Sequence, residues 1–160
     1  MRVGMGYDVH AFDESRPLVL GGVTIQDHGG LAGHSDADVV SHAVADALLG
    51  AAGLGDLGTH FSSEMVPEGI SSLQILARTA VVLADAGFTI VNIDATVVIQ
   101  NVRMAPHRLE MVSRVAGALS IDPSRVSVKA TTTDHLGFAG RGEGAAGIAV
   151  ALVDGGPTDR

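Results

Sequence analysis

The sequence predicts an α+β fold, in which helices cover one face of a mainly antiparallel or mixed β-sheet within a single domain. The length of 160 residues is enough for one hydrophobic core and too short for two domains of ordinary size. Apolar residues alternate with period two in some stretches and recur at helical spacing in others, in the order β-β-α-α-β-α-β-β. No internal repeat or linker interrupts this order, so residues 1–160 form one predicted domain, with a frayed tail over 154–160.

The first elements follow from local composition. Residues 2–9 alternate as a strand, and residues 18–25, LVLGGVTI, form an extended piece with a Gly-Gly break that pairs back on that strand. Ser35 is the expected N-cap of the helix VVSHAVADALLGAA, which ends at Gly53. The remaining elements are a helix capped by Ser71 or Ser72 and ending at Gly87, a strand over 88–100, a helix from Pro106 to Leu119, and strands over 125–133 and 145–153.

The predicted sheet has one face without helices, and its strands are very apolar. Such a face needs a cover, which oligomerisation provides at low cost. We therefore expect the chain to associate with copies of itself through this face.

Composition and charge exclude several classes of function. The formal charge of −8 and the aromatic content of 3% are opposite to the basic, aromatic surface that nucleic acid requires. There is no cysteine, so disulfides and thiolate chemistry are excluded. The N-terminus lacks a charged leader followed by an apolar run, and no apolar segment approaches a membrane span. We expect a cytoplasmic protein that binds neither membrane nor nucleic acid.

Asp8 and His10, in GYDVHAF, are the first candidates for chemistry. Residues i and i+2 of a strand point to the same side, so these two side chains lie together and Val9 faces away. His42 is the one imidazole of the first helix, and it converges with them if that helix lies beside the first strand. Two histidines and a carboxylate form a recurrent zinc ligand set, whereas a structural histidine in an Ala-rich helix is the competing interpretation. Asp38 or Asp46, one turn from His42, is the candidate to orient its ring.

Four other motifs each allow a structural and a functional interpretation. HSD (34–36) is a helix cap or an anion site that includes His34. GLGDLG (53–58) is either a simple turn or a segment whose Asp56 carboxylate accepts hydrogen bonds from a polyol. ATTT (130–133) with Asp134 is a strand end or a site for a hard divalent cation. In GRGEG (140–144), Arg141 either pairs with Glu143 or faces an anion; the motif lacks the context of a P-loop.

Together the motifs resemble one family, the 2-C-methyl-D-erythritol 2,4-cyclodiphosphate synthases of non-mevalonate isoprenoid biosynthesis. The matching stretches are GYDVHAF, LGGVTI, GHSDADVVSHAVADALLGAAGLGDLG and KATTTDHLGFAGRGEG, and their order fits along essentially the whole chain. The resemblance implies a phosphorus–oxygen lyase that converts 4-diphosphocytidyl-2-C-methyl-D-erythritol 2-phosphate to the cyclic diphosphate and releases CMP. It also implies sheets packed around the axis of a homotrimer, with active sites at subunit interfaces and an apolar central channel that could accept an isoprenoid diphosphate.

The resemblance assigns roles to individual residues. Asp8, His10 and His42 are implied to bind one Zn²⁺ per subunit, and Asp134 a Mg²⁺ or Mn²⁺ that sits with the diphosphate. His34 and Thr132 are implied to stabilise the transition state. The implied substrate contacts are Asp8, Val9, His10, His34 and Ser35 near the phosphates; Asp56, Leu57 and Gly58 at the methylerythritol; and Thr132, Thr133, Asp134, Phe138 and Arg141. The cytidine pocket, from a neighbouring subunit, is implied to comprise Ile99, Gln100, Asn101, Val102, Arg103, Met104, Ala105, Ala130 and Thr131.

Three departures from the family pattern stand out. Asp134 occupies a position that is commonly Glu, one methylene longer. Residues 62–65 read SSEM instead of an acidic P-D-T-D pattern, which puts substrate contacts from Ser62 to Met65 in doubt. IQNVRM (99–104) lacks a Pro before its basic residue. The ligand set also allows two other functions. One is a zinc-dependent hydrolase, and the other is a trimeric isoprenoid-diphosphate binding module with a structural metal.

Overall fold

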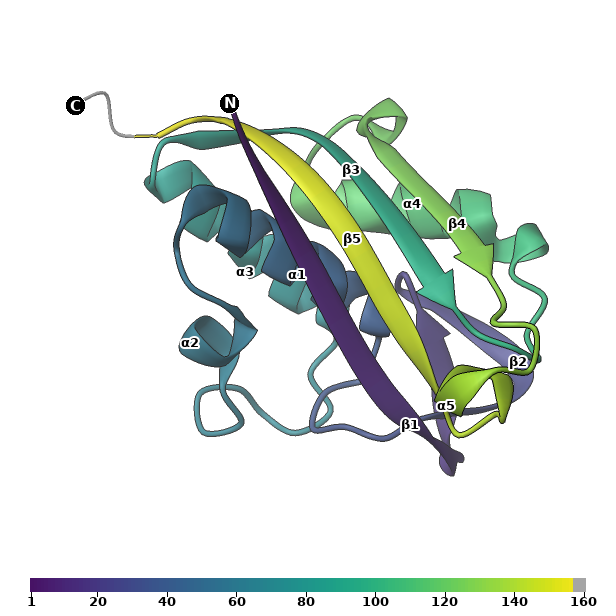
Figure 1. Ribbon diagram of the computed structural model, residues 1–160. Coiled ribbons are helices and arrows are strands. Elements are labelled where there is room, and N and C mark those ends of the chain that lie inside the picture. Colours follow the sequence, from purple (N-terminus) through teal and green to yellow (C-terminus); the bar gives the residue numbers. More distant parts are fainter. Residues whose placement is uncertain (157–160) are drawn as a thin grey trace.

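A five-stranded mixed sheet, in the order β2-β1-β5-β3-β4, is the centre of the computed structural model, which describes residues 1 to 156 (Figure 1). The elements are β1 (Arg2–Leu20), β2 (Val23–Leu31), α1 (Val39–Ala52), α2 (Leu57–Phe61), α3 (Ser72–Asp85), β3 (Phe88–Val98), the 3₁₀ turn η1 (Ala105–His107), α4 (Arg108–Leu119), the 3₁₀ turn η2 (Pro123–Arg125), β4 (Val126–Thr131), α5 (Gly137–Gly140) and β5 (Gly144–Gly155). The predicted α+β class is confirmed, as is the order of the long elements.

Strand β1 is twice as long as predicted and takes part in two pairings. Arg2 to Ala11 pair antiparallel with β5, and Phe12 to Leu20 pair antiparallel with β2. The segment 18–25 is therefore not one extended piece. It is the turn of a hairpin, because Gly21 and Gly22 have φ of 55° and 74°, values that glycine adopts without strain.

Strand β5 lies in the middle of the sheet, between β1 and β3, and pairs antiparallel with both. Strand β4 pairs parallel with β3 at the far edge. The register places Asp8, Gly147, Val97 and Ala130 in one row across β1, β5, β3 and β4. The order of residues in this row determines which parts of the predicted site can meet within one chain.

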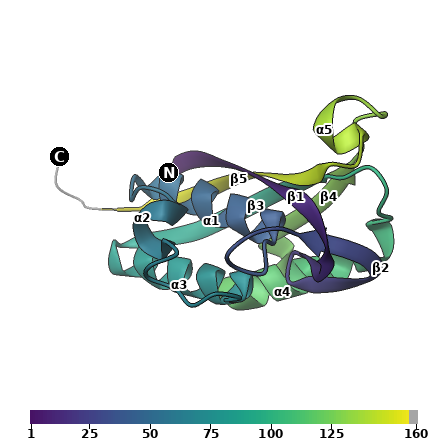
Figure 2. The same cartoon turned by 90° about the horizontal axis from the view of Figure 1, so that it is seen from below.

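Helices α1, α3 and α4 all lie against the same face of the sheet, as predicted (Figure 2). Twelve of the fourteen residues of α1 are buried, so this helix is the centre of the hydrophobic core. On the opposite face, the odd-numbered side chains of β1 are exposed: Val3 and Met5 at 68%, and Tyr7 at 53%. An apolar surface on the outer side of the sheet is what the pattern of strands predicted.

Several boundaries differ from the prediction. Asp38, not Ser35, is the N-cap of α1, because its carboxylate accepts hydrogen bonds from the backbone N–H groups of Val40 and Ser41. Helices α2 and α5 lie in segments expected to be loops. Strand β5 continues to Gly155, so Asp154 is not part of a frayed tail; residues 157–160 of that predicted tail lie outside the described residues. Within residues 1–156, no helix is long and apolar enough to cross a membrane.

Candidate functional site

Two glycines allow β1 to lie directly against α1. A Cβ on Gly4 would lie 2.1 Å from the carbonyl oxygen of Ala47, and one on Gly6 would lie 1.9 Å from that of Ala43. Side chains therefore cannot separate strand and helix along this stretch. Asp8 and His10 follow on the same side of the strand with period two, so both point toward α1.

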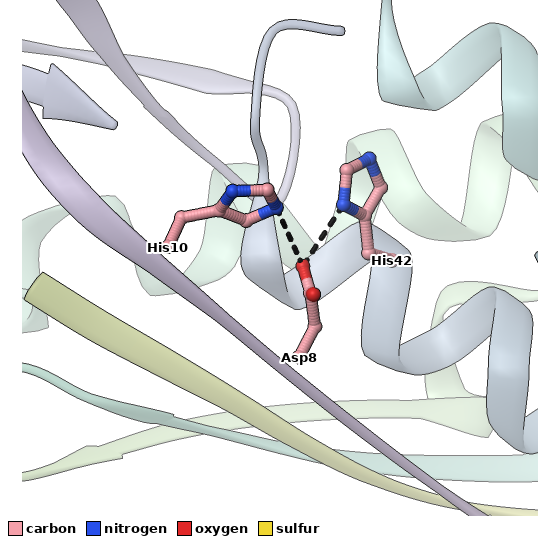
Figure 3. A group of neighbouring side chains, drawn as sticks. All are labelled: Asp8, His10 and His42. Atoms are coloured by element: carbon pink, nitrogen blue, oxygen red, sulfur yellow. Dashed lines mark hydrogen bonds and ion pairs between the residues drawn. The ribbon is translucent and has the colours of Figure 1, made fainter. Parts of the chain in front are cut away.

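Asp8, His10 and His42 converge, as the spacing predicted, and one carboxylate oxygen lies between two imidazole rings (Figure 3). Asp8 Oδ2 is 2.9 Å from His42 Nδ1 and 3.1 Å from His10 Nε2. Partial burial acts to raise the pKa of Asp8, but the hydrogen bonds from His10 and His42 outweigh it and hold that pKa well below its usual range. The hydrogen bond to Asp8 raises the pKa of His10. This cluster therefore favours a positive charge among its three side chains.

The remaining ring nitrogens show that the three residues fit a metal ion. His10 donates its Nδ1–H to the carbonyl oxygen of Ala32 at 2.5 Å, which leaves the lone pair of Nε2 facing the Asp8 carboxylate in a neutral ring. Two acceptors at 3.1 Å repel each other unless a proton or a metal ion lies between them. Ligand atoms about 2.1 Å from a tetrahedral ion would be about 3.4 Å apart, a few tenths of an ångström more than the observed 2.9 and 3.1 Å. A histidine whose second nitrogen donates to a carbonyl is also the usual arrangement at metal sites.

The loop before α1 brings His34 and Ser35 beside His10 and His42. Arg16 donates hydrogen bonds to the carbonyl oxygens of Gly33 and Ser35, which holds the loop against β1. His34 Nε2 lies 3.0 Å from the carbonyl oxygen of Val66. A cleft of about 230 Å³ opens here, and its lining comes from four segments: His10, His34, Ser35, His42, Leu57, Gly58, Phe61, Ser63, Val66 and Ile75.

Asp56, Leu57 and Gly58 begin the short helix α2 at the edge of this cleft. The Asp56 carboxylate caps the helix by accepting the backbone N–H of Thr59 at 2.8 Å, and its hydrogen bonds with Thr59 lower its pKa. The divergent segment Ser62–Met65 follows directly, and Ser63 lines the cleft.

Neither carboxylate predicted to orient His42 hydrogen-bonds to it. Asp38 is fully buried in capping contacts, and Asp46 accepts the backbone N–H of Leu57 at 2.8 Å. Ser35 and Ser72 are the partners instead, each with its Oγ 3.0 Å from His42 Nε2. The sequence reasoning missed Ser72, together with Arg16. Ser72 lies 30 residues from His42 in the chain and is otherwise an ordinary helix-start serine, so no local signal marks it.

Four of the other predicted site residues lie toward the opposite edge of the sheet. Arg103, Met104, Ala105 and Ala130 line a second hollow of about 250 Å³, beside Val97, Arg108, Met111, Val128 and Lys129. Two strands, β5 and β3, separate Asp8 from Ala130 in the row that they share. Three strand spacings amount to about 14 Å. The structure therefore does not bring the metal cluster and this second hollow together within one chain.

Of the predicted nucleotide stretch, Ile99 is buried and its N–H bonds to the carbonyl oxygen of Thr131, whereas Gln100 Oε1 accepts the N–H of His135 at 3.2 Å. Asn101 and Val102 line a separate hollow beside Phe12.

Thr132, Thr133 and Asp134 follow β4, and Thr132 Oγ1 lies 3.2 Å from an Asp134 carboxylate oxygen. Phe138 and Thr133 line an apolar hollow of about 310 Å³ that includes Tyr7 on the outer face of the sheet. Arg141 pairs with Glu143 at 2.8 Å, which is the structural alternative for GRGEG.

Comparisons with known proteins identify the family. Residues 1–154 match the model of the YgbB family. A protein of Pelotomaculum thermopropionicum named 2-C-methyl-D-erythritol 2,4-cyclodiphosphate synthase is 60% identical over 96% of this chain and 95% of its own length. A protein of the same name from Syntrophobacter fumaroxidans is 55% identical over 96% of this chain and 97% of its own.

Solved structures agree. The bifunctional IspDF of Campylobacter jejuni is similar with a TM-score of 0.91 and 40% identity over 98% of this chain, which spans 42% of that longer protein. The CDP complex of IspF from Plasmodium falciparum is similar with a TM-score of 0.83 and 31% identity, over 98% of this chain and 97% of its own. The resemblance inferred from the motifs is confirmed, and the chain belongs to the YgbB family.

Proposed function

We propose that the protein converts 4-diphosphocytidyl-2-C-methyl-D-erythritol 2-phosphate to 2-C-methyl-D-erythritol 2,4-cyclodiphosphate and CMP, as a phosphorus–oxygen lyase. The observation that carries the proposal is the convergence of Asp8, His10 and His42 beside the cleft that holds His34 and Ser35. Relatives of the same length, up to 60% identical, bear the name of this synthase, and a structural relative contains CDP.

The reaction joins two phosphates of one molecule. An oxygen of the 2-phosphate forms a bond to the β-phosphorus, and the bond from that phosphorus to the oxygen of CMP breaks, so CMP leaves with the electron pair. The 2-phosphate is already anionic at neutral pH, so no protein base has to create the nucleophile. What the protein must do is position two anions in line, which can contribute about 7–11 kcal/mol in well-oriented cases.

Metal ions fit the donor sets present. Asp8, His10 and His42 suit Zn²⁺, and Asp134 with phosphate oxygens suits Mg²⁺ or Mn²⁺. When bound, these ions neutralise charge on the diphosphate and thereby reduce its repulsion toward the attacking phosphate. The shorter side chain of Asp134 is compatible with this role through a small shift or a bridging water.

The remaining roles belong to side chains of the cleft and the second hollow. His34 and Ser35 bind the phosphates, and His34 with Thr132 stabilises the transition state. Asp56, Leu57 and Gly58 hold the methylerythritol. The segment Ile99 to Ala105, with Ala130 and Thr131, binds the cytidine; the hollow of about 250 Å³ at Arg103, Met104, Ala105 and Ala130 supports this assignment.

Two observations support a homotrimer with active sites at subunit interfaces. The two proposed parts of the site are separated by β5 and β3 within one chain, which supports a nucleotide pocket supplied to the metal cluster by a neighbouring subunit. The outer face of β1 is also apolar and exposed. Packing three such faces around an axis would cover them, and the apolar hollow at Phe138 makes a channel there a candidate for an isoprenoid diphosphate.

The test is incubation with the diphosphocytidyl substrate and Mg²⁺, followed by phosphorus NMR, with the mixture lacking protein as the control. We expect CMP and a cyclic diphosphate in equal amounts. CMP with an acyclic product would contradict cyclisation and identify a hydrolase. Absence of turnover, with the substrate still bound, would identify a binding module.

A further inference from the structure

His42 is held from both sides by its two ring nitrogens. Nδ1 lies 2.9 Å from Asp8, whereas Nε2 lies 3.0 Å from the hydroxyl oxygens of Ser35 and Ser72. The ring is buried, as are both serines, so water does not compete for these contacts. Which nitrogen carries the proton is therefore decided by what the two hydroxyl groups can accept or donate.

The hydroxyl proton of Ser72 is committed elsewhere. Ser72 Oγ donates a hydrogen bond to Asp36 Oδ1, and the backbone N–H of Ser72 donates to Asp36 Oδ2 at 2.9 Å. Because an ionised carboxylate only accepts hydrogen bonds, both donors of Ser72 point at Asp36. The lone pairs of Ser72 Oγ are what remains for His42, so Ser72 favours the tautomer that carries the hydrogen on Nε2.

A neutral histidine protonated at Nε2 presents a free lone pair at Nδ1, and Nδ1 is the nitrogen that faces Asp8 and His10. Metal ions bind the unprotonated nitrogen. We propose that Ser72, held by Asp36, is a positioning residue that fixes the tautomer of His42 and so prepares the three-residue cluster for its metal ion. The inference rests on the proposed metal at Asp8, His10 and His42, but the tautomer can be measured without any metal.

Ser35 has a different task from Ser72. Ser35 Oγ accepts the backbone N–H of Ala37 at 3.0 Å, and it has no carboxylate among residues 1–156 that takes its hydroxyl proton. That proton is available to a bound phosphate, in agreement with the proposed contact of Ser35. His10 needs no such side chain, because the carbonyl of Ala32 fixes its tautomer. A substitution of Ser72 therefore changes the hydrogen bonding of a proposed metal ligand, His42, without removing a ligand.

The first test compares Ser72→Ala with Ser71→Ala. Ser71 is the N-cap of the same helix, and its side chain makes no capping hydrogen bond, so it is a matched control. We expect zinc affinity, measured by competition with a chelator, to fall about 10- to 100-fold in Ser72→Ala and to stay unchanged in Ser71→Ala. Equal zinc affinity for Ser72→Ala and the unsubstituted protein would overturn the inference.

The second test reads the tautomer in the metal-free protein by two-bond ¹H–¹⁵N NMR of the imidazole rings. His42 should carry a hydrogen at Nε2 in the unsubstituted protein, and in Ser72→Ala and Asp36→Asn it should lose that hydrogen in part, in favour of the form protonated only at Nδ1, which faces Asp8. Full retention of the hydrogen on Nε2 in Ser72→Ala would overturn the inference. Failure of the unsubstituted protein to bind zinc would instead contradict the proposed function, so the two outcomes are distinguishable. A purely structural role for Ser72 would change the melting temperature and leave the tautomer as it is.

Discussion

At the scale of single residues, Asp38 connects the β1–β2 turn to α1 through one buried carboxylate. It accepts the N–H groups of Gly21 and Gly22 from the β1–β2 turn at 2.8 and 2.7 Å, and it caps α1. Replacing a cap costs about 0.5–2 kcal/mol, and each buried donor left unpaired costs about 1–3 kcal/mol. We expect Asp38→Ala to lower the free energy of unfolding by about 3 kcal/mol, measured by denaturant titration.

Asp122→Ala is the control for this prediction. Asp122 also caps a helical turn, by accepting the N–H of Ser124 at 2.8 Å, but the site is exposed and water replaces the lost partner. Its effect should stay near the low end of the cost of a cap, about 0.5 kcal/mol. Similar losses for both variants would contradict the view that burial and the Gly21–Gly22 contacts make Asp38 important.

His42 is expected to matter for the metal more than for the fold. In His42→Ala, the bound metal would lose one of three protein ligands. Zinc affinity should therefore fall by more than about 100-fold, which exceeds the loss expected from replacing a residue that only hydrogen-bonds to a ligand. Synthase activity should be lost with it, while circular dichroism stays native. His107→Ala, outside the cluster, should retain zinc. Full zinc content of purified His42→Ala, measured by atomic emission, would exclude His42 as a ligand.

How far the site could be predicted depends on how local its signals are. Asp8 and His10 share a strand face two residues apart, so periodicity identifies them. His42 is marked as the one imidazole of a helix. The partner of His42 was assigned wrongly to Asp38 or Asp46, because helix spacing alone favours residues one turn away. Ser72 comes from α3, and only tertiary packing brings it to the ring.

At the scale of elements, the close approach of β1 to α1 sets the position of Asp8. In Gly6→Ala the new Cβ would lie 1.9 Å from the Ala43 carbonyl oxygen, so strand and helix must separate. We expect a loss of about 3 kcal/mol in unfolding free energy and weaker zinc binding. Gly50→Ala, in α1 itself, has no atom within 4 Å of the new Cβ and should instead stabilise the protein by about 0.5–1 kcal/mol. A neutral Gly6→Ala would contradict this account.

The long elements were predictable because hydrophobic period, glycine and proline mark them. The exceptions share one physical cause, which is that tertiary contacts decide what local sequence leaves open. Ser35, Asp36 and Asp38 are all acceptable caps, and the contact of Asp38 with the β1–β2 turn decides among them. The five residues of α2 are too few to show a period, although Asp56 is a good cap. Residues 13–16 of β1, DESR, are polar, and the pairing of the residues around them with β2 extends the strand.

At the scale of the whole molecule, the distance between the two parts of the proposed site predicts that activity depends on assembly. The metal cluster lies on β1 and α1, whereas the proposed nucleotide pocket lies beside β3 and β4, about 14 Å away along the row of the sheet. A monomer would therefore bind zinc and yet fail to bring diphosphate and cytidine into one site. Zinc content and activity should respond differently to a substitution that affects only association.

Val3→Asp is that substitution, with Val81→Asp as its matched control. Val3 lies on the uncovered face of β1 and is 68% exposed, and Val81 lies on α3 and is 58% exposed, so a carboxylate at either position is solvated in a single chain. In a trimer packed through the sheets, the carboxylate introduced by Val3→Asp would be buried without a partner, which costs several kcal/mol per interface. We expect Val3→Asp to sediment as a monomer that keeps zinc and loses CMP release, and Val81→Asp to behave as the unsubstituted protein. An active, trimeric Val3→Asp would show that the uncovered face of β1 is not the interface, and the partner that completes the site would then have to approach from the helix side of the sheet.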